Sequence, residues 1–359
     1  MADSPTRLHK GHGALSNPPS RFNREHVESI DDGWYMEDAD GARLPTTVEP
    51  DRARSVISTN DSPDVGFEQS INPYRGCAHA CTYCYARPSH AYLGLSPGLD
   101  FETRLFYKAD AARVLTEELS RPGYLCKPIA LGANTDPYQP IEKRLRVTRS
   151  VLEVLRDCDH PVSIITKSSM ILRDLDILRE LAGKQLVHVT VSVTTLDAEL
   201  KRKLEPQAAA PQARLAAIRA LARSGVSVGV LVAPVIPGIT DQELERIIEA
   251  VAQAGAISAG YVLLRLPHEV KTLFREWLAE HYPQRAAHVM SLIHELRGGA
   301  DNDPRFGHRM RGTGPFADLL RKRFQLAAGR SGLQGKSRPP LVTTLFRRPG
   351  PQAELPFGP

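Results

Sequence analysis

The chain has 359 residues, a formal net charge of +5 and 42% hydrophobic residues, a length that allows two ordinary domains or one barrel-sized domain with extensions. No apolar run approaches the ~20 residues that a membrane-spanning helix requires, and the polar, proline-bearing N-terminus lacks the apolar core of a secretory signal. Five cysteines, three of them in one short loop, form no disulfide framework. The sequence therefore predicts a cytoplasmic protein and excludes an integral membrane protein or a disulfide-rich secreted domain.

The first 60 residues are rich in Pro, Ser, Asn, Asp and Arg and have few periodic apolar positions. A segment of this composition buries too little apolar surface to offset the loss of chain entropy on folding. We therefore predict that residues 1–60 form a flexible N-terminal extension outside the folded core.

The most informative motif is a CxxxCxxC loop made by Cys77, Cys81 and Cys84. Three thiolates at this density indicate a soft-metal site and favour an iron-sulfur cluster. Such clusters are usually held by four cysteines, and no fourth cysteine lies near this loop. One iron is therefore predicted to keep an open coordination position, which is a catalytic feature.

Two other interpretations of these cysteines stay open. His79 could join the three thiolates in a structural zinc site, although structural zinc usually takes its ligands from two separated segments. That alternative describes a zinc-stabilised, non-catalytic nucleic-acid-binding protein. Cys81 and Cys84 could also form a redox pair, but such a pair leaves Cys77 unexplained. We expect His79 to be a loop residue and not a ligand.

Short apolar segments alternate with longer helical patterns between the two ends of the chain, which is typical of parallel βα units. Near-continuous apolar runs suit strands that are buried on both faces. Thr240 and Glu243 match a capping box at the start of one intervening helix. Periodicity alone leaves a doubly wound sheet and a partial barrel equally open. The six predicted strands are residues 67–72, 128–133, 162–166, 187–193, 226–233 and 260–265.

The cysteine spacing, with the aromatic Tyr83 directly before the last cysteine, resembles the signature of the radical S-adenosylmethionine (radical SAM) superfamily. The resemblance implies an α/β fold, a partial (β/α)6 TIM-type barrel, here residues 61–270. It also implies a [4Fe-4S] cluster on the three cysteines, with S-adenosylmethionine chelating the fourth iron near Tyr83. Reductive cleavage of that cofactor to a 5'-deoxyadenosyl radical would need an electron donor of the flavodoxin or ferredoxin type.

Polar residues follow three successive predicted strands, at the edge where such folds build their active sites. Asn134 and Asp136 follow the second strand, where the superfamily commonly binds the amino end of S-adenosylmethionine, and both residue types are also ordinary in turns. Lys167 follows the third strand and could pair with a carboxylate. Ser192 ends the fourth strand and could donate a hydrogen bond to one.

The pattern Thr166-Lys167, Ser192 and Glu205-Pro206 resembles the spore photoproduct lyase-like branch of the superfamily. This narrower resemblance implies that Lys167, Ser192 and Glu205 contact S-adenosylmethionine. The lyase carries a hydrogen-donating cysteine in the loop after the second strand, and this chain has no thiol there. Tyr138 in the same loop is our candidate hydrogen donor, and the catalytic residues are otherwise unknown.

The C-terminal part of the chain is strongly basic. Residues 305–359 hold eleven Lys or Arg against two carboxylates, a net charge of +9. We predict a helical extension over residues 271–330 and a flexible basic, proline-rich tail over residues 331–359. Because Lys and Arg that neutralise phosphates release counterions, this region is a candidate surface for nucleic acid.

Overall fold

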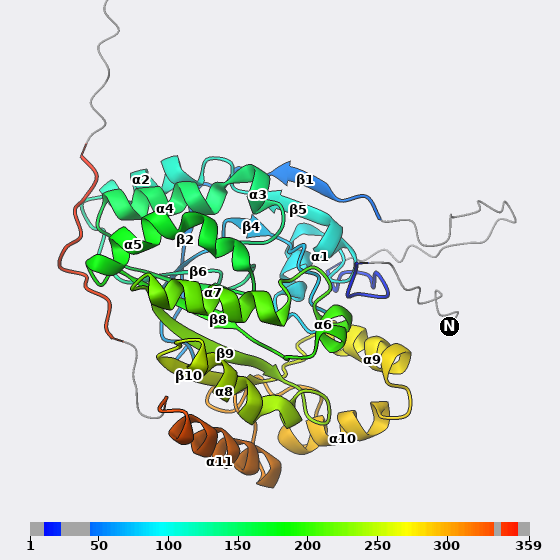
Figure 1. Cartoon of the computed structure of the whole chain (residues 1–359). Helices are drawn as coiled ribbons and strands as arrows, with labels where there is room; N and C mark the ends of the chain where they lie inside the picture. The colour runs from blue at the N-terminus through cyan, green and yellow to red at the C-terminus, as the bar shows by residue number, and fades with distance from the viewer. Residues whose placement is uncertain (1–10, 23–43, 334–338, 351–359) are drawn as a thin grey trace, which may run out of the picture.

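The computed structural model describes residues 11–22, 44–333 and 339–350. Its main feature is a seven-stranded sheet with the order β10-β9-β8-β7-β6-β3-β2 (Figure 1). The sheet is open, with β10 at one edge and β2 at the other, as in a partial barrel. Its strands are β2 (Ile57–Thr59), β3 (Gln69–Ile71), β6 (Ile129–Leu131), β7 (Val162–Thr166), β8 (Val187–Ser192), β9 (Ser227–Val235) and β10 (Ser258–Leu263).

The six strands from β3 to β10 run parallel, and only β2 joins antiparallel. All six correspond to predicted strands, so the predicted order of βα units and the partial-barrel fold class are confirmed. Every residue of β8 is buried, as expected for a parallel strand covered on both faces. Because the strands are parallel, the loops after them gather at one edge of the sheet.

Helices cover one side of these strands in a row formed by α2, α4, α5, α7 and α8 (Figure 1). Their apolar faces pack on the strands and form the main core. The α-helices are α1 (Asp100–Thr103), α2 (Ala111–Ser120), α3 (Glu142–Leu145), α4 (Val147–Asp157), α5 (Leu175–Gly183), α6 (Ala198–Leu204), α7 (Pro211–Arg223), α8 (Leu244–Gln253), α9 (Val270–His281), α10 (Ala286–Leu296) and α11 (Pro315–Arg330). Short 3₁₀ helices are η1 (Arg87–Leu93), η2 (Ser169–Asp174) and η3 (Asp241–Glu243).

The predicted capping box before α8 is wrong. The Thr240 hydroxyl accepts a hydrogen bond from the backbone of Ile236 (2.8 Å) and makes no cap to the helix. The Glu243 carboxylate accepts hydrogen bonds from the Thr195 hydroxyl and from the backbone N–H of Leu196 (2.9 Å). Both side chains therefore join loops at the strand ends instead of capping one helix.

Parts of the predicted N-terminal extension belong to the folded body. β1 (Thr47–Pro50) pairs with β5 (Arg104–Tyr107) in a small second sheet that also contains β4 (Tyr74–Arg75), and β2 extends the main sheet. Residues 11–22 pack against the cysteine loop, and Ala14 and Leu15 are buried there. Residues 1–10 and 23–43 of the extension lie outside the described residues, and the predicted boundary at residue 60 stays a prediction.

The C-terminal part also packs on the core. In α11, Arg323 pairs with Glu245 of α8, and Phe324 contacts Tyr261 of β10. Residues 339–350 then cross the end of the sheet where the parallel strands begin: the backbone N–H of Val342 bonds to Gln185, and that of Arg347 to Cys158. Residues 334–338 and 351–359 of the predicted tail lie outside the described residues. None of the described helices is long and apolar enough to span a membrane.

Candidate active site

The cysteine loop lies between β4 and η1, where the backbone geometry is demanding. Gly76, directly before Cys77, has φ +71, and a Cβ there would lie 2.9 Å from the Phe101 carbonyl oxygen. That carbonyl accepts a hydrogen bond from the Cys77 N–H (2.9 Å). Ala80, directly before Cys81, also has a positive φ of 57. Glycine is therefore required at position 76, because only it combines the left-handed backbone with this close approach.

The three thiols lie near enough to affect one another's pKa, and two of them are buried. Cys77 and Cys81 are each 7% exposed, and Cys84 is half-buried. Burial raises the pKa of all three thiols, that of Cys77 to about 12, and the nearby Cys84 adds to the increase at both Cys77 and Cys81. Thiolates in such a place require a compensating cation. A positively charged metal centre meets that requirement, so the donor set fits an iron-sulfur cluster.

A buried arginine holds the loop in place. Arg87 is fully buried, and its guanidinium donates to the carbonyl oxygens of Cys81 (2.9 Å), Pro97 (3.1 Å) and Gly98 (2.9 Å). It also forms an ion pair with Glu102, which is itself buried. Because an unpaired buried charge is strongly destabilising, the Arg87–Glu102 pair fixes the Cys81 backbone as a unit.

The same glutamate attaches the N-terminal segment to the cysteine loop. Its carboxylate accepts hydrogen bonds from the backbone N–H groups of Gly13 (3.0 Å) and Ala14 (2.9 Å). The Gly13 carbonyl in turn accepts a hydrogen bond from Thr82 (3.0 Å). A Cβ on Gly13 would lie 1.9 Å from the carbonyl oxygen of Ala80, so the two backbones touch. We call residues 11–18 the N-terminal strap.

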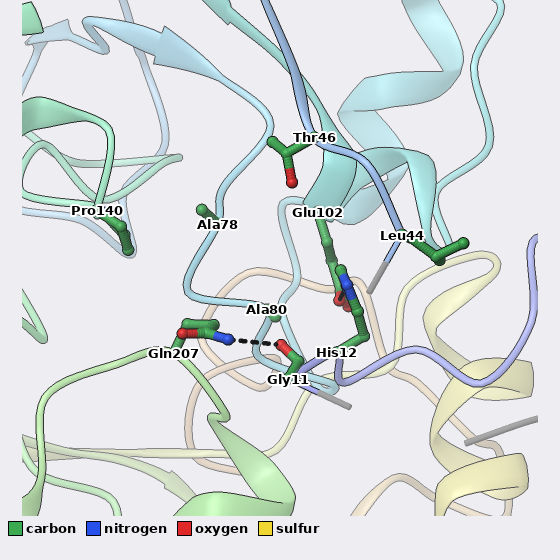
Figure 2. Close-up of a pocket in the computed structure, with 9 residues that line it drawn as sticks. All are labelled: Gly11, His12, Leu44, Thr46, Ala78, Ala80, Glu102, Pro140 and Gln207. Atoms are coloured by element: carbon green, nitrogen blue, oxygen red, sulfur yellow. Dashed lines mark hydrogen bonds and ion pairs between the residues drawn. The ribbon is translucent and has the colours of Figure 1, made fainter. Parts of the chain in front are cut away.

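A cavity of about 160 Å³ opens between the strap and the outer side of the cysteine loop. Figure 2 shows Gly11 and His12 of the strap beside Ala80, with Ala78 and Pro140 across the space. The Gln207 amide closes one side by donating to the Gly11 carbonyl (3.2 Å). Of the residues between the cysteines that line the cavity, Ala78 is half-buried and Ala80 is buried.

Asp136 joins two loops through its carboxylate. The oxygen Oδ1 accepts hydrogen bonds from Thr166 (2.7 Å) and the Tyr138 N–H (2.9 Å), and Oδ2 accepts one from the Lys167 N–H (2.7 Å). His79 Nδ1 lies 3.3 Å from Oδ2. Burial raises the pKa of Asp136, but His79 and these hydrogen bonds outweigh it and lower the pKa to about 2. Both oxygens are therefore engaged within the protein.

Glu205 is the centre of a second buried network. One carboxylate oxygen accepts hydrogen bonds from Tyr83 and from Thr194 (2.6 Å), and the other pairs with Arg214. Arg214 also donates to the Ser192 carbonyl (3.0 Å). Burial raises the pKa of Glu205, but Arg214 and Lys167 outweigh it and lower the pKa to about 2. The network places the Tyr83 ring against the strand ends.

The other predicted cofactor residues keep polar atoms available. Within the described residues, the Lys167 ammonium makes no ion pair or hydrogen bond and lies 5.9 Å from the Tyr83 ring centroid. Its charge lowers the pKa of Cys81, against the larger effect of burial. The Ser192 hydroxyl likewise has no described hydrogen bond, and Asn134 donates only a long one to Ser89 (3.4 Å). These groups could receive a ligand carboxylate or ammonium.

Tyr138 lies in the main hydrophobic core and is fully buried. Its hydroxyl has no hydrogen-bond partner among the described residues, and the Arg173 guanidinium lies 6.0 Å from its ring centroid. Its neighbours Asp174 and Arg173 belong to η2. This position gives the proposed hydrogen donor no support, and the role of Tyr138 stays a prediction.

Sequence reasoning missed the residues that position the loop. Arg87, Glu102 and Arg214 carry no motif, and only their complete burial in the folded chain identifies them. Tyr85 was missed as well, although its place directly after Cys84 was a usable signal. Its side chain is 48% exposed, and its hydroxyl donates to the carbonyl of Ala133 after β6.

The zinc alternative finds no support in the geometry. In the part of the chain that the structure describes, no three His, Cys, Asp or Glu side chains gather as ligands of a single ion would, and this holds for Cys77, Cys81 and Cys84 as well, so it does not distinguish a zinc site from a cluster. His79 faces Asp136, as a loop residue.

Comparisons with known proteins agree with the geometry. A profile of the Radical SAM superfamily matches residues 71–251. An uncharacterized protein of Mycobacterium tuberculosis (strain ATCC 25618 / H37Rv) is 37% identical over 292 residues, which are 78% of this chain and 82% of that protein. The radical SAM Nalpha-GlyT isomerase of Pseudomonas phage M6 is 26% identical over 247 residues, 65% of this chain and 48% of that protein.

Among solved structures, a tyrosine-to-phenylalanine mutant of spore photoproduct lyase superposes with a TM-score of 0.51 and 18% identity, over 79% of this chain and 78% of that chain. This likeness shows a shared fold. The superfamily profile covers half of this chain and includes the cysteine loop and the strands from β6 to β9. The chain therefore belongs to the Radical SAM superfamily of enzymes, whose cofactors are a [4Fe-4S] cluster and S-adenosylmethionine.

Proposed function

We propose that Cys77, Cys81 and Cys84 hold the [4Fe-4S] cluster of this enzyme and that S-adenosylmethionine binds beside it at the strand ends. The observation that carries the proposal is that Cys77 and Cys81 are buried and Cys84 half-buried, while the nearby Lys167 ammonium, which lowers the Cys81 pKa, makes no ion pair or hydrogen bond within the described residues. When bound, these cofactors supply a 5'-deoxyadenosyl radical that abstracts hydrogen from the substrate.

We assign the site residues to two roles, contact with S-adenosylmethionine and positioning of other residues. Lys167, Ser192 and Asn134 have polar atoms available, so we assign them to direct contact with S-adenosylmethionine, Lys167 to its carboxylate. Asp136 and Glu205 are engaged inside the protein, so we assign them to positioning. Asp136 holds the Lys167 backbone, and Glu205 orients Tyr83 beside the cofactor.

Radical SAM enzymes require a reductant, and we propose an electron donor of the flavodoxin or ferredoxin type. The surface cavity beside Ala78 and Ala80 supports a donor approach from the outer side of the cysteine loop (Figure 2). The three loop cysteines are free thiols, which persist in a reducing compartment. This supports the proposal that the protein is located in the cytoplasm.

The test is anaerobic reconstitution with iron and sulfide, followed by measurement of 5'-deoxyadenosine formed with dithionite. The wild-type protein should hold about four iron and four sulfide per chain. Replacement of all three loop cysteines by alanine should abolish both the cluster absorbance and the product. Cys126→Ala, half-buried and outside the loop, is the matched control and should retain both. A triple variant with cluster and product intact would refute the proposal, and one zinc without sulfide would favour the zinc alternative.

We propose nucleic acid as the substrate class. Five of the eleven basic residues in the C-terminal region pair with carboxylates, which weakens the case for a general basic surface. α11 packs against α8, on the outside of the sheet (Figure 1). Arg305 and Arg309 are among these paired residues, so the support that residues 305–312 give comes from their position beside the carboxyl end of β10, where the Leu263 N–H bonds to the Met310 carbonyl.

A further inference from the structure

A loop of the C-terminal region is fixed beside the carboxyl end of β10. The backbone N–H of Leu263 bonds to the carbonyl oxygen of Met310 (2.9 Å). Arg297 is 3% exposed and donates to the carbonyl oxygen of Arg309 (2.9 Å). We call residues 306–312 the rim loop. These bonds make it a fixed part of the fold.

The first cation of the rim loop is already neutralised. Arg309 pairs with Asp64 and donates to Ser62, two residues that precede β3 in the chain. Asp64 also accepts a hydrogen bond from the backbone N–H of Gly307 (2.7 Å). The carboxylate of Asp64 is therefore fully used by the rim loop.

Arg265, just after β10, is in a different position. Within the described residues its guanidinium makes no ion pair, and its Nε is buried without a hydrogen-bond partner. The contact that it does make is with the Met310 sulfur, at 3.9 Å, a weak acceptor. Burial lowers the pKa of Arg265, and Arg309 lowers it further. Asp64 acts in the opposite direction, but its carboxylate is bonded to Arg309 and Gly307 and forms no ion pair with Arg265. A partly desolvated cation without an ion pair is costly, and an anionic ligand would reduce that cost.

This guanidinium lies beside the cysteine loop, at the open edge of the sheet. Arg265 sits 5.5 Å from the ring centroid of Tyr85, the residue that follows Cys84. The Tyr85 hydroxyl bonds to Ala133 after β6, so the ring spans the strand ends between β6 and β10. A ligand bound to Arg265 would therefore sit next to the cluster loop.

Two exposed aromatic rings accompany the guanidinium groups of this region, Tyr85 beside Arg265 and Phe306 beside Arg309. Tyr85 is 48% exposed and Phe306 of the rim loop 56% exposed, each with a guanidinium on one side of its ring. Bases of single-stranded nucleic acid stack on such rings, and guanidinium groups bind phosphate in a bidentate manner. An acidic peptide could pair with the Arg265 guanidinium but would have no bases to stack on the rings of Tyr85 and Phe306.

We propose that Arg265 binds a phosphate of a single-stranded nucleic-acid substrate and that Tyr85 and Phe306 stack against its bases. This inference rests on the proposed function and names the substrate class and its anchor. A reaction on a nucleobase requires that the base be unstacked. A single strand can present such a base at this open edge of the sheet.

The test measures binding of fluorescein-labelled single-stranded oligothymidylate to the reconstituted holoenzyme by fluorescence anisotropy over a range of salt concentrations. Arg265→Met should weaken binding by about tenfold or more and reduce the salt slope by about one. Arg265→Lys should give an intermediate loss of affinity, because lysine keeps the positive charge but lacks the planar guanidinium that binds a phosphate with two hydrogen bonds. Arg321→Met is the matched control, an exposed cation of α11, and should change binding less than twofold.

Thermal unfolding separates this role from a structural one. The melting temperature of Arg265→Met should stay the same or rise, because an unpaired desolvated cation is removed. A fall in melting temperature with unchanged anisotropy would overturn the proposal. So would tighter binding of labelled oligoglutamate than of oligothymidylate, or a loss of S-adenosylmethionine binding equal to the loss of oligonucleotide binding. Wild-type enzyme that forms 5'-deoxyadenosine but binds no oligonucleotide would refute this inference and the proposed substrate class, and would leave the proposed cluster and S-adenosylmethionine chemistry intact.

Discussion

At the scale of single residues, the site separates charges that are already paired from charges that are available. Glu205 and Asp136 have both oxygens engaged, while the Lys167 ammonium is within reach of the cysteines and has no described partner. Because a buried charge is retained only with a partner or a ligand, this contrast is our basis for proposing Glu205 and Asp136 as positioning residues and Lys167 as a binding residue. The same reasoning applies to Arg265 at the rim.

Acid titration should reveal the Glu205 network. The folded pKa of about 2 lies below the ordinary value of 4.5, so the carboxylate stabilises the fold above about pH 4.5 and loses this contribution as the pH falls toward 2. A shift of that size corresponds to at most about 3 kcal/mol. Glu205→Gln should be less stable at pH 7 and should lose less further stability on acidification. Equal slopes of unfolding free energy against pH in the two proteins would contradict this.

Loss of the Lys167 charge should affect cofactor binding more than folding. We expect Lys167→Met to weaken S-adenosylmethionine binding about tenfold, because one charge-assisted hydrogen bond to the cofactor carboxylate is lost. Isothermal titration calorimetry on the reconstituted protein measures the dissociation constant of S-adenosylmethionine. Lys184→Met, which removes a lysine paired with Asp159, serves as the control and should keep wild-type affinity. An unchanged dissociation constant in Lys167→Met would remove Lys167 from the site.

At the scale of elements, the cysteine loop depends on segments that are distant in the sequence. The N-terminal strap contacts it directly, and the strap is in turn held by Glu102 of α1. Gln139 after β6 adds another anchor, accepting a hydrogen bond from the Ala78 N–H (2.8 Å) and donating to the Gly76 carbonyl (3.2 Å). The geometry of the three thiols is thus a property of several packed elements.

Gly13→Ala should loosen this arrangement. The new Cβ would meet the Ala80 carbonyl at 1.9 Å, so the strap must move away from the loop. We expect a loss of about 1–3 kcal/mol of unfolding free energy and a faster loss of iron to a chelator. Gly66→Ala is the control, because a Cβ there meets nothing within 4 Å. Iron release at the wild-type rate in Gly13→Ala would show that the strap does not hold the loop.

At the scale of the whole molecule, the two ends of the sheet carry different kinds of residues. The carboxyl ends of the strands carry the cysteines and the polar groups, whereas residues 339–350 cross the opposite end. There Phe346 contacts Tyr124 (5.6 Å between ring centroids) and His160 (5.3 Å). Chain segments that contribute stability are thus separated from those that contribute chemistry.

Phe346→Ala should therefore affect stability alone. Loss of the ring contacts of a half-buried aromatic side chain should cost about 1–2 kcal/mol, measured by chemical denaturation. The yield of 5'-deoxyadenosine per cluster should stay at the wild-type level. Leu345→Ala, at a 43% exposed neighbour, should change stability much less. A fall in product yield with Phe346→Ala would show that the two ends of the sheet are coupled.

The local pattern of the chain was enough to predict the superfamily and the six parallel strands, and the role of the three cysteines as cluster ligands stays a prediction. These features are readable because short-range spacing and apolar periodicity determine them. The same loops supplied Asn134, Lys167 and Ser192 as candidates, because parallel strands must bring their carboxyl ends to one edge.

Contacts between residues that are far apart in the sequence could not be predicted in this way. The pairing of Arg87 with Glu102, of Arg214 with Glu205, and the contact of Gly13 with Ala80 have no local signature. A charged side chain looks the same in a sequence whether it is solvated, paired or desolvated. Packing alone determines which charges lose their water and which of them find a partner, and so it alone reveals that, among the residues the structure describes, Arg265 makes no ion pair and its buried Nε makes no hydrogen bond.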